Sequence, residues 1–233
     1  LLLMLISRLI PLVVVISSAL KYASSLVLKP LAIPMMEGGA ILAKAGEELV
    51  SITESSTFQC YGGALSAAGA SLRNSGDCLS QAGANARNKF AAEMAGDECR
   101  EGAVCLLECS EKMNQFITEE MDDMPLSLPL SLSSTITDAS NNAEMAGRVM
   151  FSQGMKGGKG KQDDVDKEAL GKFLNGLGLS LKEVHETLKA QEVACNGWGV
   201  MCSHLDNAAE KFLSASTEIQ GIKPEKPTGR SFL

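Results

Sequence analysis

Aromatic side chains are scarce in this sequence. Its 233 residues include one Trp, two Tyr and seven Phe, whereas 22 positions are glycine. Aromatic rings normally supply much of the buried area of a globular core. A thick aromatic core is therefore excluded, and the abundance of alanine, glycine, serine and leucine favours helices that approach one another closely.

Histidine is almost absent, and the motifs of common catalytic sites are missing. His185 and His204 are 19 residues apart, so on one helix they would be separated by about 28 Å and could not act together. Each is predicted to lie on the surface. The glycine-rich residues 154–162 fail as a phosphate-binding loop, because no Ser or Thr follows Lys161. We therefore expect a protein that is not an enzyme.

Metal-binding motifs are missing as well. The acidic clusters at 119–123 and 163–166 lack the alternating ligands of a calcium loop, and the sequence has no CxxC pair. A metal site formed by Cys195, Cys202 and His204 is only a minor alternative. We predict no metal and no cofactor, and contacts with a pigment or with lipid would come through partners.

Acidic residues are absent from the first 36 positions, whose only charged residues are Arg8, Lys21 and Lys29. Without these three, 18 basic residues remain against 28 acidic ones, so residues 37–233 carry a net charge of −10. The acidic balance disfavours a nucleic-acid partner. A cationic, apolar arm thus precedes an acidic body.

The arm is apolar enough to cross a membrane. Residues 1–20 include a single charged residue, and about 20 apolar residues span the hydrocarbon of a bilayer. We expect residues 1–36 to form an N-terminal hydrophobic helix, with a transmembrane or deeply inserted one favoured. Two other interpretations stay open, an arm that docks between other subunits or at the membrane interface and a targeting segment. Arg8 and Pro11 count against a simple span.

Downstream of the arm, apolar residues recur at alternating steps of three and four, the spacing of a helix that buries one stripe against other helices. The longest stripe covers residues 181–219 and predicts a continuous or gently kinked helix. Two shorter helices are the alternative, because Asn196–Gly197 is a strong turn dipeptide. The side chains predicted to form a partner-packing seam here are Leu181, Val184, Leu188, Trp198, Leu205 and Phe212.

Shorter stripes of the same kind lie at 42–52, 58–86, 99–116 and 136–150. Together the stripes predict an all-α protein, an amphipathic bundle of four or five helices with heptad-like seams. Gly69, Gly76 and Gly83 repeat every seven residues within one stripe. Because glycine weakens a helix by about 1 kcal/mol relative to alanine, we expect this repeat to permit close contact with another helix.

Glycine and proline mark the predicted breaks. Gly38–Gly39 is interpreted as a break and residues 60–63 as a turn, and Pro30 and Pro34 are expected to stop or kink a helix before Met35. The predicted organisation is an arm at 1–36, helical regions at 37–123 and 135–220, a Pro/Ser/Leu linker at 124–134, a flexible loop at 154–164 and an extended tail at 221–233.

Seven cysteines are many for a reduced protein of this size. Four of them, Cys99, Cys109, Cys195 and Cys202, fall on predicted seams. One interpretation is that they are small core hydrophobes. The other is one or two interhelical disulfides between the 99–109 and 195–202 segments, which would indicate an oxidising compartment. Heptad position alone does not establish the Cα separation of about 5.5 Å that a disulfide requires.

These features favour a non-enzymatic accessory or scaffold subunit of a large organellar membrane complex, of the photosystem, ATP synthase or respiratory type. The expected partners are the other subunits and membrane lipids. The expected location is the chloroplast thylakoid or the mitochondrial inner membrane, with the acidic helical body on the aqueous side. The alternative is an autonomous membrane-active protein that binds, remodels or permeates lipid.

Overall fold

The computed structural model describes residues 26–52, 56–82, 90–119, 128–155, 166–191 and 197–221. These residues form six α-helices and contain no β-strand, so the predicted all-α bundle is confirmed, with more helices than the four or five expected. A short 3-10 helix, η1 (Lys29–Leu31), comes first. The α-helices are α2 (Ala32–Ser51), α3 (Ser56–Ser80), α4 (Ala91–Glu119), α5 (Ser131–Met155), α6 (Lys167–Lys189) and α7 (Trp198–Gln220).

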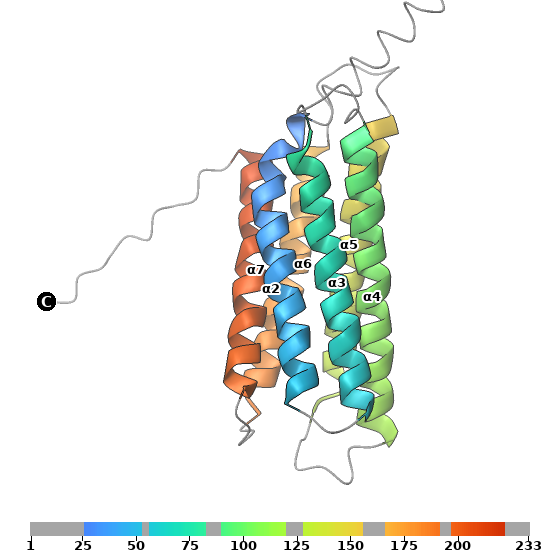
Figure 1. Ribbon diagram of the computed structural model, residues 1–233, viewed down its shortest axis with the longest axis vertical. Coiled ribbons are helices and arrows are strands. Elements are labelled where there is room, and N and C mark those ends of the chain that lie inside the picture. The colour runs from blue at the N-terminus through green and yellow to red at the C-terminus, as the bar shows by residue number, and fades with distance from the viewer. Residues whose placement is uncertain are drawn as a thin grey trace, which may run out of the picture.

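The six helices form a closed ring (Figure 1). Each helix packs against the helix before it and the helix after it, and α7 closes the ring by packing on α2. Neighbouring helices run antiparallel. Between α2 and α3, for example, Gly39 lies against Gly69, whereas Gly46, further along α2, lies against Gly62, earlier in α3. The fold is therefore an up-and-down helical bundle in which every helix has two partners.

Glycines allow the backbones of α2 and α3 to touch. A Cβ atom added to Gly39 would lie 2.3 Å from the backbone nitrogen of Arg73, and one added to Gly69 would lie 2.2 Å from that of Ala43. Gly76 meets the start of α2 in the same way. The expected role of the seven-residue glycine repeat is thus confirmed for Gly69 and Gly76, while Gly83 lies outside the described residues.

Small polar side chains link neighbouring helices through backbone carbonyls. The hydroxyl of Ser75 donates to the carbonyl of Ala95 across α3 and α4, at 2.7 Å. Equivalent 2.7 Å bonds join Ser140 to the Ala103 carbonyl, between α5 and α4, and Ser216 to the Gly171 carbonyl, between α7 and α6. Such bonds satisfy serines that are buried among apolar neighbours.

The axis of the ring is filled by apolar side chains from all six helices. A void of about 20 Å³ remains among them, and no polar surface lines it. That volume holds at most one water molecule, and an apolar void of this size offers water no hydrogen bonds. Tyr61 borders the void, fully buried, and its hydroxyl donates to the sulfur of Met113. The centre is thus a packed core.

The predicted continuous helix over 181–219 is wrong. α6 ends at Lys189, and α7 begins at Trp198 and returns antiparallel to it. Gly197 has a φ of +101°, a left-handed conformation that glycine adopts without strain, and it is the N-cap residue of α7. The Asn-Gly turn signal therefore outweighs the unbroken heptad spacing, which continues because both helices place their apolar stripes in one core.

Two predicted breaks lie inside helices. Gly38 and Gly39 fall within α2, where Gly38 faces Phe212 of α7 and Gly39 faces α3, so they provide space for neighbours. Residues 60–63 belong to α3, and Gly62 faces α2 for the same reason. The predicted linker 124–134 is too long, since α5 begins at Ser131, and α5 also extends two residues into the loop expected at 154–164.

The predicted arm overlaps the bundle. α2 begins at Ala32 and contains Pro34 in its first turn, where proline removes no helical hydrogen bond. The expected stop before Met35 is therefore wrong. Residues 1–25, which hold most of the predicted hydrophobic helix, lie outside the described residues, and no helix among those described is long and apolar enough to cross a membrane.

Replacement of Gly39 by alanine tests the backbone contact. We expect Gly39→Ala to lower the free energy of unfolding by about 3 kcal/mol, because the new methyl group overlaps the α3 backbone. The matched control is Gly63→Ala, since a Cβ at this exposed position of α3 meets no atom within 4 Å. It should raise stability by about 0.5–1 kcal/mol. Urea unfolding measures both, and equal effects would contradict the close approach.

Candidate functional site

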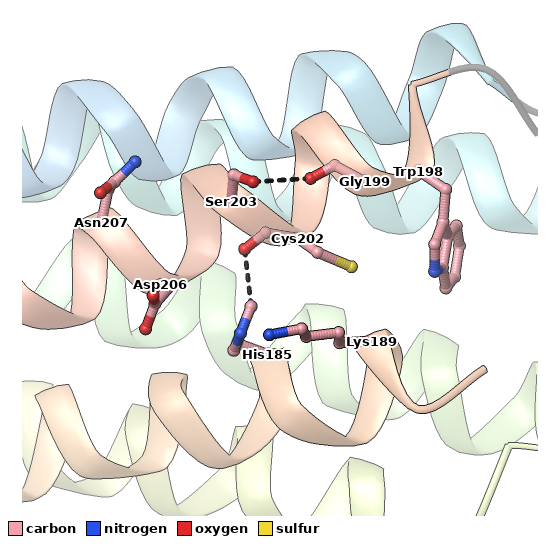
Figure 2. A pocket seen from close by; sticks show the side chains of 8 residues that line it. All are labelled: His185, Lys189, Trp198, Gly199, Cys202, Ser203, Asp206 and Asn207. Atoms are coloured by element: carbon pink, nitrogen blue, oxygen red, sulfur yellow. Dashed lines mark hydrogen bonds between the residues drawn. The ribbon is translucent and has the colours of Figure 1, made fainter. Parts of the chain in front are cut away.

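A hollow with a mixed polar and apolar lining lies between α6 and α7, near the hairpin that joins them (Figure 2). It is a groove of about 400 Å³. α6 contributes His185 and Lys189, and α7 contributes the rest of the lining, Trp198, Gly199, Cys202, Ser203, Asp206 and Asn207. Cationic, anionic and aromatic side chains meet here, which makes the groove the leading candidate site.

His185 is fixed in the wall of this groove. Its side chain is buried, and Nδ1 lies 2.7 Å from the backbone oxygen of Cys202 (Figure 2). Because a carbonyl only accepts hydrogen bonds, Nδ1 carries the proton, which leaves Nε2 as the acceptor in the neutral ring. Nε2 lies 3.6 Å from Oε1 of Glu186. The prediction that His185 lies on the surface is wrong, because the antiparallel return of α7 covers it.

Trp198 and Gly199 form the hairpin end of the groove. The indole Nε1 of Trp198 donates to the carbonyl of Leu188 at 3.1 Å, which ties the start of α7 to the end of α6. A Cβ added to Gly199 would meet no atom within 4 Å, so the backbone is bare at this point. Ser203 closes this turn by donating to the Gly199 carbonyl at 2.8 Å.

Asp206 is the unusual group of the site. Its Oδ1 atom is buried and has no hydrogen-bond partner among the described residues. A buried carboxylate oxygen without a donor is costly, so the position favours a visiting donor or a bridging water molecule. Lys189 lines the same groove from α6. In the sequence, Asp206 has the position of an ordinary residue on the solvated face of a helix. No sequence pattern distinguishes it from the other acidic residues there.

The cysteine of the groove is not a nucleophile at neutral pH. Burial raises the pKa of the Cys202 thiol to about 11, although Lys189 opposes part of this increase. Thiolate, the reactive form, is therefore nearly absent. With His185 tied to a carbonyl and Cys202 protonated, the groove can bind a small polar group but contains no nucleophile and base in mutual contact.

The predicted interhelical disulfides are not formed among the described cysteines. Cys99, Cys109 and Cys202 are free thiols. Cys99 and Cys109 lie on α4, which packs on α3 and α5, whereas Cys202 lies on α7, which packs on α2 and α6. The ring thus separates α4 from α7. Cys195 lies outside the described residues, so a bridge that involves it stays a prediction.

Cys99 and Cys109 of α4 instead belong to the core, as the other interpretation held. Cys99 donates to the carbonyl of Ala143 at 3.3 Å, and Cys109 donates to that of Tyr61 at 3.7 Å. Burial raises the pKa of each thiol to about 12. Nearby acids add to this, Glu144 for Cys99 and Glu108 for Cys109.

All side chains of the predicted partner-packing seam are buried inside this chain's own bundle. They pack with helices of the same polypeptide, because the two halves of the seam lie on neighbouring antiparallel helices. The seam residues are Leu181, Val184 and Leu188 on α6 and Trp198, Leu205 and Phe212 on α7.

Comparison with known proteins adds no relative: no family model, no curated protein and no solved structure matches this chain.

Thiol alkylation tests this placement of the cysteines. In the native protein near neutral pH, we expect iodoacetamide to modify the exposed Cys60 first and to leave Cys99 and Cys109 unmodified, because these two are buried and protonated. Denaturation before alkylation is the control and should expose every thiol. Peptide mass spectrometry reads each site, and native Cys99 reacting as fast as Cys60 would contradict the structure.

The raised thiol pKa values also predict how stability depends on pH. The unfolded chain releases thiol protons near pH 9, whereas folded Cys99 and Cys109 keep theirs until about pH 12. Unfolding is therefore increasingly favoured as the pH rises from 9 toward 12. We expect Cys99→Ala and Cys109→Ala to reduce this slope in urea unfolding, and Gly63→Ala, which removes no titratable group and meets no atom within 4 Å, to leave it unchanged. Parallel pH profiles for the three variants would refute the assignment.

Proposed function

We propose that this chain is a non-enzymatic accessory subunit that stabilises a large organellar membrane assembly, of the photosystem, ATP synthase or respiratory type. Its partners are the other subunits and membrane lipids, and it carries no cofactor of its own. The thylakoid and the mitochondrial inner membrane are the two proposed locations, with the helical bundle on the aqueous side.

The way the arm joins the bundle carries this proposal. Leu28 and Leu31 are fully buried, and η1 packs against α2, α3 and α7. The described part of the chain that follows residues 1–25, whose only charges are Arg8 and Lys21, is therefore held in the core from Leu28 onward. An apolar sequence next to a segment that is held in a packed body supports the role of a subunit.

The outer face offers contact points for other subunits. Between α4 and α5 lies a groove of about 520 Å³, in which Val104 is 59% exposed and Leu107 is 42% exposed. Arg100 and Glu144 form an ion pair across it, with 3.4 Å between Nε and Oε1. An apolar floor with a charged rim resembles the composition of protein interfaces. This arrangement supports stabilisation of the assembly through helix packing.

Ring closure weighs against the alternative, an autonomous protein that remodels or permeates lipid. Such proteins insert the apolar faces of their helices into the bilayer. Here those faces are buried in the ring, and α7 seals it against α2. Lipid insertion of the helices would require the bundle to open and lose its core.

Sizing of native membranes in mild detergent tests the proposal. We expect the chain to migrate with a particle much larger than its own 24.6 kDa and to stay there after a salt wash, because helix packing resists salt. Migration as a monomer or small homo-oligomer would refute the subunit role and favour the lipid-acting alternative.

Paired surface variants make this test specific. Val104→Ser with Leu107→Ser removes the apolar floor of the α4–α5 groove. Leu179→Ser with Val200→Ser removes two similarly exposed side chains elsewhere. If the groove contacts the assembly, the first pair alone should release the chain from the large particle, and the second pair controls for a general loss of surface hydrophobicity.

A further inference from the structure

The groove between α6 and α7 contains a polar atom that the bundle does not satisfy. Oδ1 of Asp206 is buried and has no hydrogen-bond partner among the described residues, and the side chain lines the groove. In Figure 2 this carboxylate points from α7 toward α6. A buried carboxylate oxygen without a donor is costly. A ligand that supplies a donor is therefore favoured at this point.

The fixed donors of the groove are already used by backbone carbonyls. His185 donates from Nδ1 to one carbonyl at 2.7 Å, and Trp198 donates from Nε1 to another at 3.1 Å. The hydroxyl of Ser203 donates to a third at 2.8 Å. None of these three side chains has a donor left for Asp206, so the partner of its buried oxygen has to come from elsewhere.

Lys189 brings a positive charge to the same groove from the other helix. It is exposed in the last turn of α6 and forms no ion pair with an acid of the described part of the chain. Its ammonium is nevertheless near enough to oppose the rise in the pKa of the Cys202 thiol. A carboxylate on α7 and an unpaired cation on α6 thus line one groove of about 400 Å³.

We propose that the α6–α7 groove binds a small zwitterion, whose primary ammonium group bonds to Asp206 and whose carboxylate lies on Lys189. This inference goes beyond the proposed subunit role and does not depend on it. Hydrogen bonds between two charged groups are about twice as strong as those between neutral ones. The volume of the groove lies in the range of small-molecule sites. The ligand would join α6 to α7 through its two ends.

The lining of the groove disfavours other classes of ligand. A simple anion would be repelled by Asp206, and a simple cation by Lys189. Nowhere in the described ranges are three His, Cys, Asp or Glu side chains grouped to hold a metal ion. Trp198 is 6% exposed, so it offers a planar ligand no open ring face. Only a ligand that carries both charges satisfies both walls.

NMR titration of the isotope-labelled full chain tests the ligand class. Glycine, γ-aminobutyrate and ε-aminocaproate present an ammonium and a carboxylate at increasing separations, whereas butylamine and butyrate each carry one charge. We expect the tightest of the three zwitterions to bind about tenfold more tightly than either singly charged probe. The shifted backbone amides should cluster in residues 185–189 and 198–207, which line the groove.

Removal of the Asp206 charge locates the ammonium end of the ligand. Asp206→Asn keeps the size of the side chain and should weaken binding of the zwitterion about tenfold. Glu218→Gln is the matched control, since this exposed acid lies about 18 Å further along α7. The control should leave the affinity unchanged.

Removal of the Lys189 charge locates the carboxylate end and has effects of opposite sign on two probes. Lys189→Gln should weaken binding of the zwitterion and strengthen binding of butylamine, because the repulsion of a cation is lost. Lys172→Gln, at an exposed position near the start of α6, is the control and should change neither affinity.

Urea unfolding separates binding from a structural role of Asp206. Because its buried oxygen has no partner, Asp206→Asn should unfold at the same urea concentration as the wild type or at a higher one. A lower midpoint would show that the carboxylate stabilises the bundle itself and would overturn the inference.

Three further results would also overturn it. Butylamine or butyrate that binds as tightly as every zwitterion would show that one charge is enough. Amide shifts outside the α6–α7 groove would place the site elsewhere. No shift with any probe would assign the buried oxygen of Asp206 to a water molecule. The proposed subunit role is tested separately, by migration of the chain in detergent, and none of these results changes it.

Discussion

Direct contact between helix backbones is the constraint on which this structure depends. Gly39 and Gly69 bring α2 and α3 so close that a methyl group at either position would overlap the opposite main chain. Gly96 and Gly147 do the same for α4 and α5. At such points a helix can slide or rotate only by losing the fit, so the glycines fix the register of each pair. The cost of glycine within a helix is offset by dispersion contacts that larger side chains would prevent.

Close approach also determines how the buried polar groups are satisfied. Helices this near to one another let a short side chain reach a neighbouring carbonyl, as Ser75, Ser140 and Ser216 do. Cys99 uses the same geometry with a weaker donor. A core of leucine and small side chains with few aromatic residues is thus cross-linked by hydrogen bonds between its helices. Asp206 is the exception, and its buried oxygen makes the α6–α7 groove a place for a donor.

The closed ring leaves particular surfaces for partners. The apolar stripes of all six helices are buried inside the ring. The surfaces that remain for contacts with other molecules are the outer grooves and the two ends of the bundle. The α4–α5 groove combines exposed Val104 and Leu107 with a charged rim.

The sequence by itself determined that the chain is helical, which residues face a core, and that glycines spaced by seven mark close contact. Leu181, Leu205 and Phe212 are all buried as their spacing indicates, because a periodicity of 3.5 reports one face of a helix. Tertiary structure decided whether a glycine interrupts a helix or faces a neighbour, since Gly38–Gly39 and Asn196–Gly197 both offered a break and only the second one ends a helix. It also decided that α7 turns back on α6, which buries His185, leaves Asp206 without a donor and keeps Cys202 away from α4. Those outcomes depend on which helices meet, and residue spacing within one helix contains no information about that.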